Sequence, residues 1–123
     1  MSYIDAPTRT FPNNSAIAPH TRVKMSNGFL APAGATDQDI GVLEFRTQVS
    51  DAFGTVRLRS AAGTHKAIAN AAIAAYTDTF TAASGKVGAG TTGAFYRGIA
   101  VTAAGADGDI IEILPMFGDS AHA

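Results

Sequence analysis

An Asn-Gly pair between two short strand-like segments constrains the fold more than any other feature of the sequence. Residues 21–25 (Thr-Arg-Val-Lys-Met) alternate polar and apolar side chains with the period of two that a half-buried strand requires. Asn27 and Gly28 follow, and both residue types tolerate the positive φ angles of a type I′ turn. Residues 29–31 (Phe-Leu-Ala) suit a returning strand. The pattern predicts an antiparallel β-hairpin.

Short strands with glycine-containing turns continue along the rest of the chain. Residues 55–59 alternate cleanly, Asp107-Gly108 suits a second hairpin turn, and Pro115 ends the last strand by removing a donor. No segment recurs at a fixed period. Roughly seven or eight strands predict a mainly β fold, a small β-sandwich or barrel. The other expected strands cover residues 40–45, 63–68, 85–88, 94–102 and 109–114.

One stretch in the middle of the chain favours a helix. Ala69, Ala72, Ile73 and Tyr76 recur at the i, i+3, i+4, i+7 spacing of a helical face. The alanine content also favours helix, whereas the β-prone residues 77–81 that follow would end it. We therefore predict one short helix near residues 67–75, with its apolar face in the core.

The first twenty residues have the features of an extended N-terminal arm. Prolines remove backbone donors and favour extended geometry, and apolar side chains are spaced along the segment. One interpretation is a loosely packed terminus, and the other is a segment whose apolar residues dock on a partner. We expect an arm over residues 1–20, a β domain over 21–115 and a C-terminal tail over 116–123. The prolines are Pro7, Pro12 and Pro19, and the apolar residues are Tyr3, Ile4, Phe11 and Ile17.

The apolar composition predicts a thin core. The chain has 123 residues, the length of one domain, and 46% of them are apolar. Of these, 25 are alanines, and only 26 are leucine, isoleucine, valine or phenylalanine. Burying a leucine or phenylalanine contributes roughly 1.5–3 kcal/mol, and an alanine contributes much less. We expect partners, including further copies of the chain, to supply part of the stability.

The charge and the missing cysteines exclude several classes of function. The chain has nine basic and ten acidic residues, so it lacks the excess of positive charge with which proteins bind nucleic acid. There is no cysteine, which excludes disulfides, thiolate zinc sites and cysteine nucleophiles. No 18 consecutive residues are apolar, and residues 1–7 do not resemble a signal peptide. We expect a protein made in the cytoplasm that binds neither membrane nor nucleic acid.

Nucleotide and metal sites have only weak support. Gly88, Gly90 and Gly93 match the G-x-G-x-x-G spacing, but a strand follows them where the motif needs a helix to hold the pyrophosphate. The histidines His20, His65 and His122 show no metal-ligand spacing, and His65 suits a surface or interface position. We predict a flexible glycine loop, no metal and no cofactor.

Acidic residues suggest no enzyme either. Glu44 and Glu112 are the only glutamates, and pairing them as a glycosidase acid and base would need a cleft that a small β domain rarely has. The pairs Asp37/Asp39 and Asp107/Asp109 suit turns better than a calcium loop. The triad residue types Asp119, Ser120 and His122 lie in the expected tail and lack rigid geometry. We predict no catalytic residue.

Nine short segments, taken in their order along the chain, form a recognisable set. They are 21–25, 35–37, 40–42, 56–58, 63–64, 66, 85–87, 98–100 and 106–115. Together they resemble tailed-bacteriophage capsid decoration (head cement) proteins. The similarity covers roughly residues 16–115, and the closing run 106–115 (Ala-Asp-Gly-Asp-Ile-Ile-Glu-Ile-Leu-Pro) is its most specific part. The arm before residue 16 shows no such similarity.

The resemblance implies a small β domain on the outside of an expanded icosahedral head. It implies a homotrimer that binds the major capsid protein, holds neighbouring subunits together, and has no catalytic residue or cofactor. In such a protein the apolar residues of the arm, Tyr3, Ile4, Phe11 and Ile17, are the candidate capsid contacts, because aromatic and apolar anchors dominate interfaces. The alternative is a carbohydrate- or host-cell-binding β module on the virion, for which Phe95 and Tyr96 would form the aromatic platform.

Overall fold

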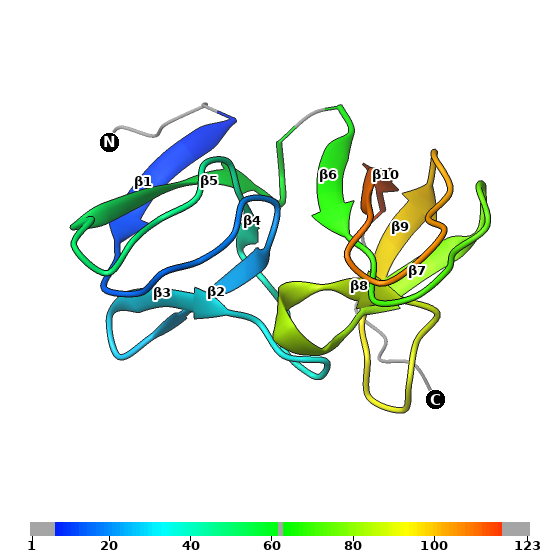
Figure 1. The fold of residues 1–123 in the computed structure, drawn as a ribbon, viewed down its shortest axis with the longest axis horizontal. Helices are drawn as coiled ribbons and strands as arrows, with labels where there is room; N and C mark the ends of the chain where they lie inside the picture. The colour runs from blue at the N-terminus through cyan, green and yellow to red at the C-terminus, as the bar shows by residue number, and fades with distance from the viewer. Residues whose placement is uncertain (1–6, 62, 117–123) are drawn as a thin grey trace, which may run out of the picture.

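The chain folds into two five-stranded antiparallel sheets that lie side by side, as the computed structural model of residues 7–61 and 63–116 shows (Figure 1). The prediction of a mainly β fold is confirmed. The first sheet contains β1 (Thr8–Pro12), β2 (Arg22–Ser26), β3 (Phe29–Pro32), β4 (Gly41–Leu43) and β5 (Phe53–Leu58). The second sheet contains β6 (His65–Ile68), β7 (Asp78–Thr81), β8 (Val87–Gly88), β9 (Tyr96–Ala100) and β10 (Ile110–Pro115).

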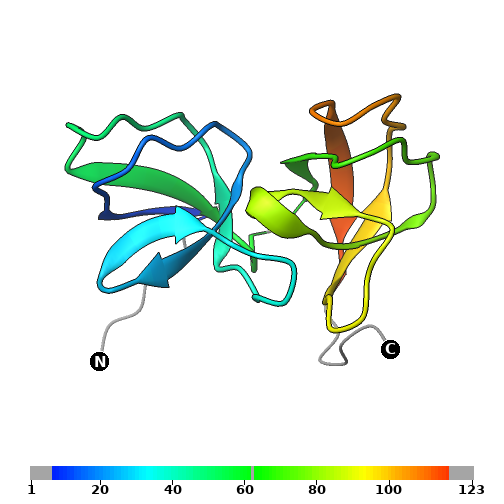
Figure 2. The same ribbon diagram turned by 60° about the horizontal axis from the view of Figure 1, so that its bottom comes forward.

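The two sheets have the same topology. Their strand orders are β1-β5-β4-β2-β3 and β6-β10-β9-β7-β8, so each strand of the first sheet has a counterpart five strands later. Both sheets curl, and the two views show them as separate lobes (Figures 1 and 2). The chain therefore consists of two tandem halves, β1–β5 and β6–β10. The structure thus contains a repeat of strand order where the sequence showed no repeat at a fixed period.

Hydrogen bonds outside the strands recur in the two halves. Ile17 bridges Thr47 in the first half, and Ile73 bridges Ala104 in the second. The nitrogen of His20 donates to Leu43 at 2.7 Å, and that of Tyr76 donates to Ala100 at 2.6 Å. His20 and Tyr76 also share a positive φ, 66° and 64°. Such agreement in irregular segments means that the halves share their loops as well as their strand order.

A close approach of two strands is also repeated. A Cβ atom added to Gly41 would lie 2.1 Å from the carbonyl oxygen of Arg57, and one added to Gly98 would lie 2.1 Å from that of Leu114. These positions are equivalent in the two sheets. Only glycine fits where another backbone comes this close, so both halves retain it.

Each half has its own hydrophobic core. The core of the first half contains Ile17, Val23, Leu30, Leu43 and Val56, with Phe11 and Ile40 packed against it. The core of the second half is built largely from smaller side chains: Ala67, Ala69, Ile73, Val87, Ala100, Ala104, Ile111 and Ile113. Alanine thus supplies four of the eight residues in the second core and none of the described residues in the first, which agrees with the thin core expected from composition.

The predicted hairpin at Asn27-Gly28 is confirmed. Strands β2 and β3 pair from Val23–Pro32 to Ser26–Phe29, and the two turn residues have φ angles of 52° and 84°. The second turn, at Asp107-Gly108, lies inside a longer connection over residues 101–109 between the paired strands β9 and β10. There the carboxylate of Asp109 accepts hydrogen bonds from the nitrogens of Gly105 and Ala106.

Two predictions of local structure are wrong. Residues 67–75 contain the end of β6 and an irregular segment rather than a helix, because Ala67, Ala69 and Ile73 face the core of a sheet. Residues 8–20 do not form a separate arm, because β1 pairs along its length with β5. The one helical turn among the described residues is the 3-10 turn η1 (Ala83–Gly85). No described helix is long and apolar enough to span a membrane.

Candidate functional site

The buried guanidinium of Arg22 joins the two halves. Its Nε donates to the carbonyl oxygen of Lys86 at 2.8 Å, and its Nη2 donates to that of Ala82 at 2.6 Å. The same side chain reaches the carbonyl of Gly34 and the carboxylate of Asp39 in its own half. One arginine thus donates to two carbonyls around the β7–β8 turn, one of which, that of Lys86, also accepts a hydrogen bond from the nitrogen of Ala82.

Asp39 is the centre of a buried cluster of charges at this junction. Its Oδ1 lies 3.2 Å from Nη1 of Arg22, 3.5 Å from Nε of Arg97 and 3.8 Å from Nη1 of Arg59. Arg59 also donates to the carbonyl of Tyr96 at 3.1 Å. Residues from both halves therefore share one carboxylate, and removing it would leave three cations close together.

Burial lowers the pKa of the arginines in this cluster. Desolvation lowers the pKa of Arg97 to about 10, although the charge of Asp39 acts in the opposite direction. Desolvation also lowers the pKa of Arg22, again against the effect of Asp39. Arg97 still carries its charge at neutral pH, and the ion pairs with Asp39 make the cluster an ionic joint between the halves.

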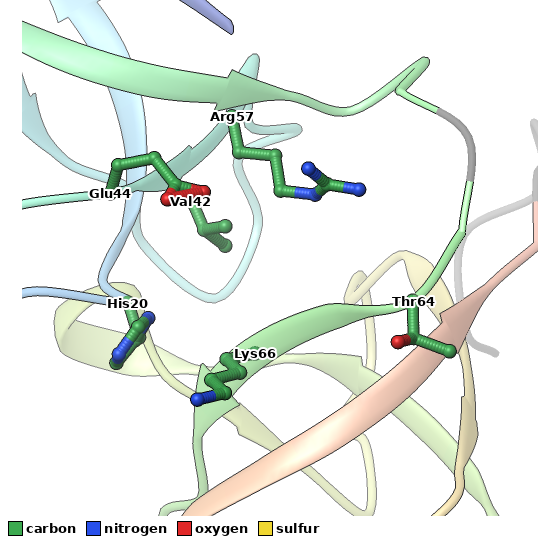
Figure 3. A pocket seen from close by; sticks show the side chains of 6 residues that line it. All are labelled: His20, Val42, Glu44, Arg57, Thr64 and Lys66. Atoms are coloured by element: carbon green, nitrogen blue, oxygen red, sulfur yellow. The ribbon is translucent and has the colours of Figure 1, made fainter. Parts of the chain in front are cut away.

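A cleft of about 330 Å³ opens beside the junction (Figure 3). Its walls come from β4, β5, β6 and the loop before β2. In Figure 3 the side chains of Lys66 and His20 face each other across the cleft. Burial, followed by the charge of Lys66, lowers the pKa of His20. The lining residues are His20, Val42, Glu44, Arg57, Thr64 and Lys66.

The cleft brings a histidine and a glutamate together but not the pair of glutamates. Glu44 lines it, whereas Glu112 accepts a hydrogen bond from the hydroxyl of Thr64 and lies outside the lining. Two-carboxylate glycoside hydrolysis needs both groups facing one substrate. The lining instead mixes three basic side chains with a single acid.

The other polar residues singled out in the sequence take part in the fold. His65 is buried, and desolvation lowers its pKa. Asp37 binds Lys24 at 2.7 Å and the nitrogen of Gly34 at 2.8 Å. Asp107 pairs with Lys86 at 2.7 Å. Asp119, Ser120 and His122 lie outside the described residues.

The candidate capsid contacts separate into two groups. Ile17 is 5% exposed and belongs to the core of the first half, and Phe11 packs against that core. Ile17 therefore supports the fold and is not available to a partner. Tyr3 and Ile4 lie outside the described residues, so their role stays a prediction.

Large apolar side chains are instead exposed on the loop between β4 and β5 and at the first residue of β5. Phe45, Val49 and Phe53 are 68%, 72% and 64% exposed, and we call these three residues the apolar tip. The loop runs from β4, which lies next to the second half, to the far end of the first half, where β5 begins (Figure 1). Exposed large apolar side chains that follow one another along a short segment suit a protein-binding surface. The period-two pattern used to find strands gave no reason to single them out.

The aromatic pair proposed for carbohydrate binding is not an open platform. Phe95 and Tyr96 are only partly exposed. The hydroxyl of Tyr96 donates to Asp78 at 3.0 Å, and its ring packs at a tilt against Phe80 with centroids 5.6 Å apart. Sugar rings stack on exposed aromatic faces, and little of this one is available.

The fold is similar to that of a solved phage structure. No family model and no curated protein sequence matches the chain. The crystal structure of the head fiber gp8.5 N base in bacteriophage phi29 superposes with a TM-score of 0.73. The match covers 89% of this chain and 92% of that chain, at 16% sequence identity. At this identity the similarity establishes a shared fold over nearly the whole of both chains.

Proposed function

We propose that this protein is a phage capsid decoration protein, a non-enzymatic component of the virion that binds the outside of the expanded head. The observation that carries the proposal is the shared fold with a protein whose name places it in the head fiber of a phage. The resemblance of residues 16–115 to head cement proteins was drawn from sequence and supports the same function independently. The partner is the major capsid protein.

The apolar tip is the surface best suited to that contact. Phe45 and Phe53 are aromatic, and aromatic anchors supply much of the binding energy at protein interfaces. Tyr3 and Ile4 add a second contact in this proposal, because they precede β1, whose N-terminal end lies in the same half. Two contacts per chain are enough to hold neighbouring capsid subunits together.

Clamping depends on several chains acting together. In a homotrimer each chain carries one apolar tip, so three tips grip the head at once. Linked contacts raise the effective concentration and increase avidity by factors on the order of 10²–10⁴. The proposed result is a shell that resists the pressure of packaged DNA.

The test is co-sedimentation of the purified protein with undecorated heads, before and after expansion. We expect saturable binding to expanded heads only. Replacing the apolar tip (Phe45→Ser, Val49→Ser, Phe53→Ser) should weaken binding at least about tenfold, because the aromatic anchors are lost. Failure of the wild-type protein to bind either form would refute the proposal.

A matched control comes from the second half. Ile110 occupies the position equivalent to Phe53 and is also exposed, so Ile110→Ser makes a similar change away from the tip. It should bind like the wild type. Deleting residues 2–6 tests Tyr3 and Ile4 without removing β1, which a longer deletion to residue 15 would take out of the sheet.

A further inference from the structure

The two halves contact each other through different surfaces. The second half contributes the turn between β7 and β8, where the nitrogen of Gly85 donates to the carbonyl of Ala33 at 2.7 Å. A Cβ atom added to Gly85 would lie 2.2 Å from Cγ2 of Thr21, so the turn packs tightly. The first half contributes the start of β2, the loop after β3 and the residue after β5. A contact between unlike surfaces is heterologous, and it can be repeated from one molecule to the next.

The first half has an equivalent turn that remains exposed. Residues 25–29, between β2 and β3, are exposed at every position. A Cβ atom added to Gly28 would meet no atom within 4 Å, in contrast to its counterpart Gly85. Met25 and Phe29 are among the large apolar side chains exposed on the molecule. The first half thus carries a copy of the element that the second half buries.

The second half has the matching acceptor face, which is exposed apart from the half-buried Tyr96. The junction residues Arg22, Asp39 and Arg59 correspond to Asp78, Tyr96 and Met116 in the second half. Met116 and its neighbour Leu114 are exposed apolar residues, and Asp78 is exposed too. We define the acceptor face by these residues: Asp78, Tyr96, Leu114 and Met116.

The two exposed surfaces share apolar side chains. Inside the chain, Arg22 binds carbonyl groups of the β7–β8 turn. On the acceptor face the position of Arg22 is taken by Asp78, which accepts a hydrogen bond from Tyr96, and that of Arg59 is taken by Met116, so docking there depends on apolar contact and not on arginine–carbonyl bonds. The exposed turn offers Met25 and Phe29, which suit an apolar face and could bury it.

We propose that copies of this chain associate head to tail, with residues 25–29 of one chain docked on the acceptor face of the next. The contact repeats between chains the packing that joins the halves within a chain. A repeated heterologous contact closes into a ring when its rotation permits. Three chains in such a ring form the homotrimer of the proposed function, but the contact itself does not depend on a capsid.

The test is sedimentation velocity on the full-length protein without heads. The wild type should sediment with three times the mass of one chain. Phe29→Asp, on the turn, and Met116→Asp, on the acceptor face, should each sediment as monomers. Both side chains are exposed, so circular dichroism should show an unchanged fold.

A mixture of the two variants separates this arrangement from a symmetric one. The Phe29→Asp chain keeps an intact acceptor face, and the Met116→Asp chain keeps an intact turn. One good contact can then form, so an equimolar mixture should contain dimers and no trimers. A monomeric wild type, trimers in both single variants, or a mixture without dimers would each overturn the proposal.

The apolar tip supplies the control and separates this proposal from the capsid function. Phe53→Asp, which lies on neither docking surface, should remain trimeric while losing affinity for heads. A wild type that forms trimers but binds no heads would refute the capsid function and leave head-to-tail association intact. A monomeric wild type that binds heads would refute head-to-tail association and leave the capsid function intact.

Discussion

The two halves of this protein share a backbone and differ in what their side chains do. In the first half, Arg22 and Asp39 are buried and hold the halves together. At the equivalent positions of the second half, Asp78 and Tyr96 form a single hydrogen bond near the surface. Strand order and turns maintain the fold in both halves. Side chains at equivalent positions are therefore free to form a buried joint in one half and part of the surface in the other.

The largest expected difference between equivalent positions is at Asp39 and Tyr96. Asp39→Asn should lower the free energy of unfolding by about 3–5 kcal/mol, because it leaves buried arginines without their counter-charge. Tyr96→Phe removes one hydrogen bond and should cost about 0.5–1.5 kcal/mol. Urea denaturation measures both.

Arg97→Met provides a control for the loss of counter-charge in Asp39→Asn. Adding Arg97→Met to Asp39→Asn removes one buried cation together with the anion, so the double variant should recover part of the lost stability. Equal losses for Asp39→Asn and Tyr96→Phe would show that the ionic joint contributes no more than an exposed hydrogen bond.

A second comparison concerns two core positions whose sizes are exchanged between the halves. Leu43 packs beside Gly54 in the first half, and their counterparts are Ala100 and Ile111. Leu43→Ala should cost about 2–5 kcal/mol by opening a cavity. Adding Gly54→Ile gives the first half the same pair of side chains, alanine and isoleucine, that the second half has at these positions. The double variant should therefore recover part of the lost stability.

The single variant Gly54→Ile is the control for this exchange. Its Cβ would lie 2.8 Å from Cδ1 of Leu30 and 3.3 Å from Cδ1 of Leu43, so it should destabilise the wild type. Thermal unfolding of the wild type, the two single variants and the double variant gives the coupling energy between the two substitutions. Simple additivity would contradict the idea that the exchange conserves volume.

A smaller difference is expected between Gly85 and Gly28. Both have positive φ angles, 72° and 84°, so alanine at either should cost about 1–2 kcal/mol for the backbone alone. At Gly85 the new methyl group would also collide with Thr21 and should cost about 1–3 kcal/mol more. Chemical denaturation of Gly85→Ala and Gly28→Ala gives the difference, and equal losses would argue against tight packing of the β7–β8 turn.

The smallest expected effect is the pH dependence contributed by one histidine in each half. Burial lowers the pKa of His65 and of His20, so the folded chain favours neutral imidazoles. The unfolded chain takes up these protons near pH 6.5. The contribution of these histidines to the free energy of unfolding should therefore be fully present above this pH. It should be lost as the pH drops below it.

Replacing His65 by glutamine should reduce that fall. Unfolding of the wild type and of His65→Gln is compared at about pH 7.5 and pH 5.5. The pH dependence of the free energy of unfolding that remains in His65→Gln is assigned to His20. Adding His20→Gln to that variant should reduce it further. An unchanged slope in the double variant would assign the pH dependence to other groups.

Local patterns in the sequence predicted much of the sheet structure. Alternation in residues 55–59 and the Asn27-Gly28 pair located β5 and the β2–β3 hairpin, since both signals depend only on neighbouring residues. The helix predicted near residues 67–75 failed because alanines at a helical spacing also fit a strand and loop that pack on a small core. Tertiary packing decided that segment, and propensity did not.

The duplication was missed although one short signal of it exists. Ala16, Ile17, Ala18 and Thr21 recur as Ala72, Ile73, Ala74 and Thr77. Elsewhere the equivalent positions have exchanged size, as at Leu43 and Gly54, or charge, as at Arg22 and Asp78. Compensating exchanges preserve a core while removing the sequence identity by which a repeat is recognised. The apolar tip and the junction are likewise visible only in three dimensions.

The separate sheets also determine the order in which the chain can fold during synthesis. Every strand pairs only with strands of its own half, so residues 8–58 can complete the first sheet before β6 leaves the ribosome. At that stage Arg22 and Asp39 are still hydrated, because the residues that cover them, 82–97, come later in the chain. The dehydration of these charges is thus postponed to a final docking step, after both cores exist to drive it.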